Sequence, residues 1–241
     1  MLLAIALLLA ACSGLAPSDD VDRLATARAF PRAHRPVSQA GSLTISSETV
    51  RDARREAAIV MDLAQIAPGM TVADIGAGDG YYTTRLAERV SRRGRVLAQD
   101  IDARALKRLG ARVERERLDN VSIKLGAQDD PRLPANSFDR VLLVRMYHEV
   151  SEPYAFLWRL RPALKPGGRV VVFDVDRPTD QHGIAPELLF CEFETTGFRL
   201  VQFVRKPEIA GYLAQFEAAG ARPEPREIKP CKFVNGQAER N

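Results

Sequence analysis

The sequence predicts an α/β domain in which helices cover both faces of a mostly parallel β-sheet. Between residues 71 and 218, short apolar runs alternate with stretches of helical period, which is the pattern of strand-helix-strand units. The run at 138–144 is almost continuously apolar, as expected for a parallel strand buried on both faces. The first run ends in three closely spaced glycines, and a helical stretch follows at once. We therefore expect a sheet built outward from one glycine loop.

The composition predicts one folded domain with additional residues at each end. The chain has 241 residues, of which 46% are hydrophobic and 27% are charged, and these values argue against disorder. The net charge of +4 comes from scattered Arg and Lys rather than from a block. No compact basic groove is expected, so nucleic acid is not an expected partner.

The elements are predicted in a regular order. A helix begins after Ser47, which is a suitable N-cap, and its apolar positions recur from Val50 to Ala64. Pro68 and Gly69 end that helix. Further helices are expected across 82–90, 106–113, 153–161 and 186–196. Strands are expected before the glycines and at 95–99, 121–125, 138–144, 169–175, 198–204 and 211–217.

The last third of the chain is less regular. The pattern at 211–217 fits either a strand or a helix. We predict a strand antiparallel to 198–204, because the connection between them is short and contains Pro207. The domain is expected to span 47–218. Residues 219–241 contain several prolines and are expected to form a surface tail.

Residues 1–12 resemble a signal peptide. Residues 1–11 are apolar or small, but as a helix they would reach only about 16 Å, roughly half of a bilayer core. They end in Leu9-Ala10-Ala11-Cys12, which is similar to the bacterial lipoprotein box, where the Cys is lipidated after cleavage. No Lys or Arg precedes Arg23, so an uncleaved apolar tail is the alternative.

The expected cellular location depends on whether Cys12 is lipidated. A lipidated Cys12 would attach the protein to a membrane surface facing the periplasm or the exterior, and otherwise a cytoplasmic location is expected. Residues 13–46 contain Pro17, Pro31, Pro36 and Gly41 among polar and small residues. We expect them to form a tether followed by a lead-in loop that lies on the domain.

The glycine loop argues against two common nucleotide sites. Its spacing is Gly76-x-Gly78-x-Gly80 rather than the G-x-G-x-x-G of dinucleotide-binding enzymes. Asp79 lies inside the loop, where a carboxylate would repel a pyrophosphate. No Lys-Ser or Lys-Thr pair follows the glycines, so a nucleoside triphosphate site is also unsupported.

The same loop carries a family resemblance. Residues 74–80, Asp-Ile-Gly-Ala-Gly-Asp-Gly, resemble motif I of the class I S-adenosylmethionine-dependent methyltransferases, and the similarity extends over 50–217. The stretches 133–139 and 164–168 resemble the segments that precede the family's fourth and fifth strands. The resemblance implies a Rossmann-like three-layer α/β/α sandwich with a seven-stranded, mostly parallel sheet and an antiparallel last strand. It also implies S-adenosylmethionine as the cofactor.

The resemblance assigns cofactor contacts to residues of this chain. Asp100 matches the acidic residue that accepts hydrogen bonds from both ribose hydroxyls, and Ile101 matches the apolar residue that packs on adenine. The expected cofactor-binding residues are Asp74, Gly76, Ala77, Gly78, Tyr82, Asp100, Ile101 and Asp129.

Two of these assignments have alternatives. The family often has Asp directly after the glycine that ends the third strand, but here Ala127 occupies that position. The acidic residues are displaced to Asp129 and Asp130, and Asp129 is the one we expect at the adenine amino group. Tyr82 follows the glycines closely enough to line the cofactor cavity, although its place on the apolar helix face also suits the core.

Candidate catalytic residues lie in 145–149, after the fourth strand, where open parallel sheets bind their ligands. Methyl transfer from a sulfonium is an in-line displacement, so a base is needed only when the acceptor must lose a proton. His148 is of the residue type that most often acts as a base, and Glu149 would orient it or contact the acceptor. The alternative is that His148 only packs over the cofactor.

No metal site is expected, because metal ligands are absent at ligand spacing, and a metal-assisted O-methyltransferase is therefore disfavoured. Cys191 and Cys231 lack His or Cys neighbours at ligand spacing. We expect them to be two unpaired thiols, and a disulfide is the alternative if the protein is exported. His34 is predicted in an exposed loop. Residues 180–183, Asp-Gln-His-Gly, follow the fifth strand and either overhang the acceptor site or form a polar surface loop.

The predicted function is methyl transfer from S-adenosylmethionine to a small molecule. The main difficulty is location, because this cofactor is made and held in the cytoplasm and an exported protein would have no evident supply. The alternative is therefore a non-catalytic binding module at a membrane surface on a methyltransferase scaffold, since a fold does not fix a function. The intact glycine and acidic positions favour the enzyme.

Overall fold

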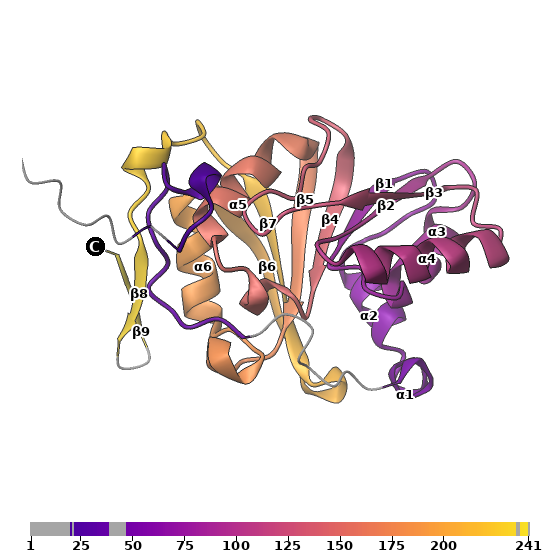
Figure 1. Cartoon of the computed structure of the whole chain (residues 1–241). Helices are drawn as coiled ribbons and strands as arrows, with labels where there is room; N and C mark the ends of the chain where they lie inside the picture. The colour runs from indigo at the N-terminus through magenta and orange to yellow at the C-terminus, as the bar shows by residue number, and fades with distance from the viewer. Residues whose placement is uncertain (1–19, 21, 39–46, 235–236, 241) are drawn as a thin grey trace, which may run out of the picture.

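The protein, here a computed structural model, is an α/β/α sandwich (Figure 1). The structure describes residues 20, 22–38, 47–234 and 237–240, so the signal-like segment with Cys12 lies outside the described residues. The strands of the main sheet are β1 (Thr71–Ile75), β2 (Arg95–Asp100), β3 (Val121–Leu125), β4 (Phe138–Val144), β5 (Leu164–Asp174), β6 (Phe198–Lys206) and β7 (Gly211–Ala218). The α-helices are α1 (Glu48–Ala53), α2 (Glu56–Leu63), α3 (Tyr81–Val90), α4 (Ala103–Arg115), α5 (Pro153–Leu160) and α6 (Pro186–Thr195).

The sheet has the predicted seven strands, in the order β3-β2-β1-β4-β5-β7-β6. The strands β1 to β5 pair in parallel, whereas β7 pairs antiparallel with both β5 and β6. This confirms the predicted fold class and the strand at 211–217. Because the parallel strands end at one edge of the sheet, the loops after β1, β2, β4 and β5 lie together there.

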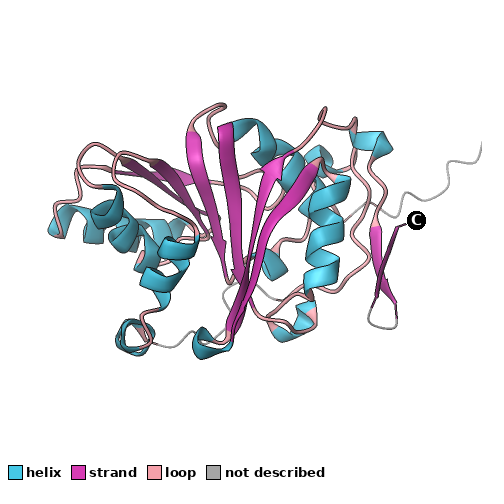
Figure 2. Ribbon diagram, turned by 180° about the vertical axis from the view of Figure 1, so that it is seen from behind, coloured by secondary structure: helices cyan, strands magenta, loops and turns pink. Residues whose placement is uncertain are grey.

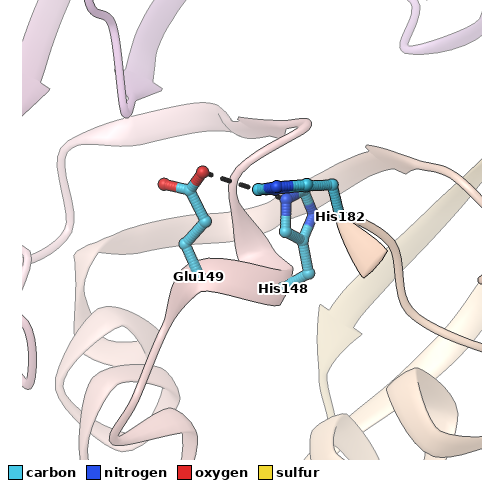
Figure 3. A group of neighbouring side chains, drawn as sticks. All are labelled: His148, Glu149 and His182. Carbon is cyan, nitrogen blue, oxygen red and sulfur yellow. Dashed lines mark ion pairs between the residues drawn. The ribbon is translucent and has the colours of Figure 1, made fainter. Parts of the chain in front are cut away.

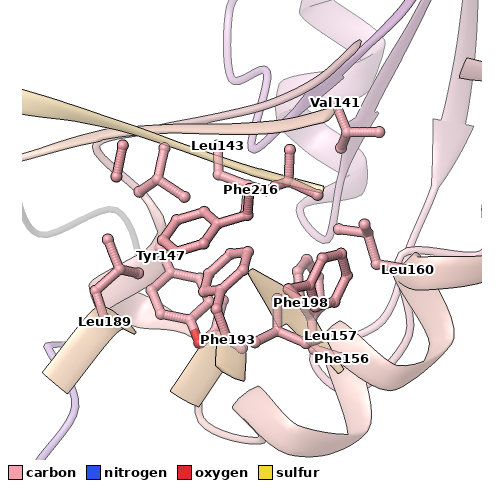
Figure 4. Close-up of a cluster of buried hydrophobic side chains, with 14 of the residues drawn as sticks. Val141, Leu143, Tyr147, Phe156, Leu157, Leu160, Leu189, Phe193, Phe198 and Phe216 are labelled. Atoms are coloured by element: carbon pink, nitrogen blue, oxygen red, sulfur yellow. The ribbon is translucent and has the colours of Figure 1, made fainter. Parts of the chain in front are cut away.

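Helices lie on both faces of the sheet (Figure 2). Along the central strands β1, β4 and β5, the alternating side chains are buried on both faces. Val72 of β1 belongs to the cluster that α2 and α3 cover, whereas Ala73 and Ile75 belong to the cluster that α5 and α6 cover. Figure 4 shows the second cluster, in which the rings of Phe193 and Phe216 stack with their centroids 3.9 Å apart. Among the described residues, no helix is long and apolar enough to span a bilayer.

The predicted helix after Ser47 is interrupted. Ser47 caps α1 as expected, since its side chain accepts a hydrogen bond from the amide of Val50. Arg55 has a φ of 55°, which no α-helix accommodates, so the chain turns there and α2 starts afresh. Val50, predicted on the apolar face, is 41% exposed as a result.

The prediction of unpaired thiols is wrong, because Cys191 of α6 and Cys231 form a disulfide. The C-terminal residues return to α6 through the 3-10 helix η6 (Pro225–Glu227) and the hairpin β8 (Cys231–Val234) and β9 (Gln237–Arg240). Cys231 is buried, and its amide donates a hydrogen bond to the Tyr154 hydroxyl. The expected surface tail is therefore partly packed on the domain.

The lead-in loop lies on the domain as expected, and it is held there by ion pairs. The short helix η1 (Ala25–Ala27) lies over α5, and Arg23 forms a buried ion pair with Glu152 at 2.6 Å. Farther along, Arg35 forms a second buried pair with Glu192 of α6 at 2.7 Å. The lead-in is thus anchored to both helices that cover this face of the sheet.

Candidate functional site

A cavity of about 460 Å³ opens at the carboxyl ends of β1, β2 and β4. Its position is that of ligand sites in open α/β sheets. The lining residues are Ile75, Gly76, Gly78, Asp79, Gln99, Asp100, Ile101, Asp102, Ala105, Arg108, Ala127, Gln128, Val144, Arg145, Met146, Glu149, Val150 and Phe156. A second, more open hollow of about 550 Å³ lies beside Ser91, Arg95 and Asn120, at the amino ends of β2 and β3, which is the opposite edge of the sheet.

The glycine loop forms one wall of this cavity. Gly76 has a φ of +70°, and a Cβ there would lie 2.9 Å from the side chain of Met146, so the position requires glycine. The amide of Gly78 donates a hydrogen bond of 2.8 Å to Oδ2 of Asp100. The loop is thereby fixed to the end of β2 before any ligand arrives.

Asp100 and Ile101 lie where the resemblance expects them. The second oxygen of Asp100, Oδ1, accepts a hydrogen bond from the amide of Asp102 at 2.9 Å, so backbone amides hold both carboxylate oxygens. A carboxylate oxygen has further lone pairs available for hydroxyl groups. Ile101 is 42% exposed and presents an apolar side chain to the cavity. The ribose and adenine roles stay predictions.

Three other predicted cofactor residues lie behind the loop and do not line the cavity. The buried Asp74 accepts a hydrogen bond from the Thr83 hydroxyl at 2.6 Å, and burial raises the pKa of Asp74 to about 6. Tyr82 is core, as the alternative for it stated, and its hydroxyl donates to Glu56. Ala77 packs against α4, and its amide donates to the Gln99 carbonyl. These residues support the loop from behind, and their contact with a cofactor stays a prediction.

Asp129 does not occupy the position expected for an adenine contact. It is 2% exposed and does not line the cavity. The Thr26 hydroxyl donates to its carboxylate at 2.6 Å, and Arg159 of α5 forms an ion pair with it at 2.7 Å. From the same loop, Ala127 and Gln128 line the cavity instead. Asp129 is therefore turned away from the cavity toward Thr26 of the lead-in. The path of the lead-in over this loop could not be derived from local sequence.

The segment 145–149 leaves the end of β4 and forms the other wall of the cavity. Arg145 has a φ of 53°, and its guanidinium donates to the Ile209 carbonyl at 2.8 Å and pairs with Glu56 at 3.3 Å. Met146 and Glu149 line the cavity, whereas Tyr147 is fully buried beneath them. A residue held at positive φ at the end of a strand is typical of functional sites.

His148 is fully buried and does not line the cavity. Its Nδ1 lies 3.0 Å from both carboxylate oxygens of Asp174, at the end of β5. Because a carboxylate accepts, Nδ1 carries a proton and Nε2 is the other available nitrogen. Nε2 lies 3.9 Å from Oε1 of Glu149. The sequence did not single out Asp174, although its place at the end of the adjacent parallel strand was a usable signal.

His182 completes this group (Figure 3). Its ring lies 5.7 Å from that of His148, centroid to centroid, in an edge-on arrangement. Its amide donates to the Ser38 hydroxyl, and Ser38 in turn donates to the Thr179 carbonyl. His182 thus lies beside His148 and Glu149, although it does not line the cavity itself.

Arg35 of the lead-in supports the same segment from outside. Its guanidinium donates to the backbone carbonyl of His148 at 3.3 Å and to that of Val150 at 3.1 Å, and it pairs with Glu192. Burial opposes the charge, but the Glu192 carboxylate raises the pKa of Arg35 above its ordinary value. Glu192 also accepts a hydrogen bond from Tyr147 at 2.8 Å. One buried network therefore fixes the helical turn η2 (Tyr147–Glu149).

Comparison with known proteins agrees with this geometry. A family model described as a methyltransferase domain matches residues 72–168. The ubiquinone/menaquinone biosynthesis C-methyltransferase UbiE of Methylococcus capsulatus is 30% identical over 150 residues, which cover 61% of this chain and 58% of that protein. The chain spans about half the length of the curated relatives it matches.

Solved structures share the fold. A SAM-dependent methyltransferase from Aquifex aeolicus superposes with a TM-score of 0.61 at 23% identity, covering 72% of this chain and 98% of that chain. The [4+2]-cyclase SpnF gives a TM-score of 0.61 at 17% identity, covering 81% and 91%. Residues 72–168 therefore match a methyltransferase domain, and the chain has the fold of the class I S-adenosylmethionine-dependent methyltransferases.

Proposed function

We propose that this protein transfers a methyl group from S-adenosylmethionine to a small-molecule acceptor. The observation that carries the proposal is the Asp100 carboxylate, which lies in the cavity and is fixed to the amide of Gly78. A carboxylate at the end of the second strand suits two ribose hydroxyls, and Asp79 inside the glycine loop would repel a pyrophosphate. The methyltransferase-domain match covers this loop and this strand.

The topology gives the cavity two ends. Ile101 follows β2, and Met146 and Glu149 follow β4, so these residues lie on opposite sides of the glycine loop after β1. We assign the first side to the nucleoside and the second side to the acceptor. The cavity of about 460 Å³ has to hold the nucleoside of the cofactor as well as the acceptor, which supports a small acceptor.

The chain's contribution to the reaction is alignment. When bound, S-adenosylmethionine supplies an electrophilic methyl carbon, to which the acceptor's lone pair bonds as the carbon–sulfur bond breaks. Glu149 is the anionic side chain at the acceptor end and is able to accept a hydrogen bond from an acceptor hydroxyl or amine. His148 lies behind it, out of reach of an acceptor in the cavity. The expected base role of His148 is therefore revised to that of a residue acting beside Glu149.

Isothermal titration of the full chain tests the proposal. We expect one S-adenosylmethionine per chain and no competition from NAD⁺, because the pyrophosphate of NAD⁺ would meet the carboxylate of Asp79 in the glycine loop. Absence of heat at millimolar S-adenosylmethionine, or preferential binding of NAD⁺, would overturn the proposal. The titration measures cofactor binding alone, so its result does not depend on the identity of the acceptor.

We further propose that the protein is exported and attached to a membrane surface through Cys12. The disulfide between Cys191 and Cys231 supports an oxidising compartment, since disulfides persist there and are rare in the cytosol. Mass spectrometry of membrane fractions tests the proposal. We expect a chain that begins at a lipidated Cys12, and recovery of a chain that begins at an unmodified Met1 would contradict it.

A further inference from the structure

We infer that His148, Glu149 and His182 bind a divalent first-row transition metal ion. Each residue offers one ligand atom, and these atoms all lie within 4.8 Å of one another. Figure 3 shows the three side chains pointing toward a common point from the turn after β4 and the loop after β5. Two imidazoles and one carboxylate suit zinc and its neighbours, whereas magnesium and calcium prefer oxygen ligands.

The His148 ring is oriented as a metal ligand. Asp174 binds Nδ1 through both of its oxygens at 3.0 Å, which directs Nε2 toward Glu149. Carboxylates hold metal-binding histidines in this way in known sites and raise the basicity of the ligand nitrogen. Among the described residues, Nε2 of His148 is buried without a hydrogen-bond partner. A buried nitrogen of this kind requires a partner, and a metal ion supplies one.

The distances permit a shared ion after a small movement. Nε2 of His148 and Oε1 of Glu149 lie 3.9 Å apart, which is too far for a hydrogen bond. Two metal–ligand bonds of about 2.1 Å place their ligand atoms about 3.4 Å apart at a tetrahedral ion, so this pair has to close by about half an ångström. The widest pair of the three, within 4.8 Å, has to close by at most about 1.4 Å to reach that separation, which rotation of the partly buried Glu149 and His182 side chains provides.

The loop that carries His182 is fixed by its backbone. The amide of Ile184 donates to the Val175 carbonyl at 2.8 Å, and a Cβ on Gly183 would lie 2.5 Å from that carbonyl oxygen. The His182 amide is bound to Ser38 of the lead-in. These backbone contacts hold the His182 ring next to the turn that follows β4.

Three protein ligands leave a fourth position open, as in catalytic zinc sites. Glu149 lines the cofactor cavity, so the ion would lie at its acceptor end. An acceptor hydroxyl or thiol bound to the ion would lose its proton more readily, and its lone pair would then form the bond to the methyl carbon while the carbon–sulfur bond breaks. This role rests on the proposed function, whereas metal binding does not.

A different arrangement explains the same geometry without a metal. A protonated His148 would lie between two carboxylates, those of Asp174 and Glu149. In that arrangement His182 is not one of the three paired side chains, and His182→Ala leaves the affinity for Zn²⁺ unchanged. The two arrangements therefore differ in what a His182 variant does.

The experiment is a titration of metal-stripped full chain with Zn²⁺ in competition with a chelator, and with Co²⁺ followed by visible absorption. All proteins carry Cys12→Ser, because Cys12 is the one cysteine outside the disulfide. We expect one ion per chain. His182→Ala and Glu149→Gln should each weaken Zn²⁺ binding by more than about 100-fold, and Asp174→Asn by about 10- to 100-fold.

His34→Ala is the matched control, because His34 is the third histidine of the chain and lies exposed on the lead-in. It should bind Zn²⁺ as the parent does. Absence of saturable binding at millimolar Zn²⁺ or Co²⁺, or equal affinity in the parent and His182→Ala, would overturn the inference. No S-adenosylmethionine is present, so failure here is distinct from failure of the proposed function.

Discussion

The amide of Gly78 donates to Oδ2 of Asp100 at 2.8 Å and so joins the loop after β1 to the end of β2. The contact lies inside the cavity and leaves the carboxylate facing it. The glycine loop and the acidic residue, 22 positions apart in the sequence, therefore form one preorganised unit. Preorganisation of this kind lowers the entropy that a ligand would lose by ordering the site itself.

Asp100→Ala should weaken S-adenosylmethionine binding. Hydrogen bonds to a charged group contribute about 1.5–3 kcal/mol, so we expect a loss of affinity of roughly 10- to 150-fold. Asp102→Ala is the control, since Asp102 also lines the cavity but its side chain caps α4 through the Arg104 amide. Isothermal titration measures both variants. Equal affinities for the two variants would contradict the ribose assignment.

Asp74→Asn should change how stability depends on pH. The folded pKa of Asp74 is raised to about 6 by burial, above the ordinary value of 3.8, so the folded state binds more protons than the unfolded state between these values. Stability from this group is complete below about pH 4 and is lost as the pH rises to about 6, by roughly 3 kcal/mol in all. The Asp74→Asn variant has no carboxyl group at this position, so its stability does not fall in this way as the pH rises.

Urea denaturation at several pH values checks the Asp74 prediction. Relative to the parent, Asp74→Asn should gain stability as the pH rises from 4 to about 6. Relative to the parent, Asp139→Asn should lose stability as the pH rises, which is the opposite change. Although burial opposes it, the Lys165 ammonium and the Thr71 amide lower the pKa of Asp139, so that carboxylate stabilises the fold above its unfolded pKa. A pH-independent difference between Asp74→Asn and the parent would contradict the raised pKa.

Removing the disulfide should destabilise the domain. The bond closes a segment with a sequence separation of 40, for which the chain-entropy model gives about 4 kcal/mol. Chemical denaturation should show a loss of this order for the Cys191→Ser/Cys231→Ser variant, and the same loss for the parent in reductant. Cys12→Ser should leave stability unchanged. Titration of three free thiols in the unreduced native protein would show that the bond is not formed.

Arg35→Met should destabilise the fold because it leaves Glu192 as a buried charge without its cation. Breaking a buried pair costs about 3–5 kcal/mol. Adding Glu192→Gln should recover part of that cost, so the double variant is more stable than the sum of the single effects predicts. Arg32→Met is the control, since its pair with Asp22 is exposed to solvent, which screens the attraction, and its loss should change stability little. Additive effects of the two buried substitutions would contradict the coupling.

The sequence predicted the parts of the site that local pattern determines. The strand before Gly76, the turn itself and the acidic end of β2 follow from short stretches whose periodicity and glycine spacing are visible in the chain. Asp100 and Glu149 were predicted to face the site for this reason, and both line the cavity. The antiparallel pairing of β6 with β7 followed from a short connection containing Pro207.

The incorrect predictions concern residues whose partners lie far away in the sequence. Asp129 bonds to Thr26, 103 positions earlier, and Cys231 bonds to Cys191 only because the C-terminal residues fold back on α6. The proximity of His182 to His148 depends on the path of the loop after β5. No local pattern encodes these paths, since they follow from the packing of the lead-in, the loop and the C-terminal hairpin on a completed sheet.

A crystal structure of the full chain with S-adenosylhomocysteine tests the central claim most directly. The account predicts the ribose hydroxyls on the carboxylate of Asp100, the adenine on Ile101 and the sulfur facing Met146 and Glu149. A ligand bound at the opposite edge of the sheet, beside Ser91 and Asn120, would contradict it. So would a cavity at Gly76–Gly80 that stays empty at saturating ligand.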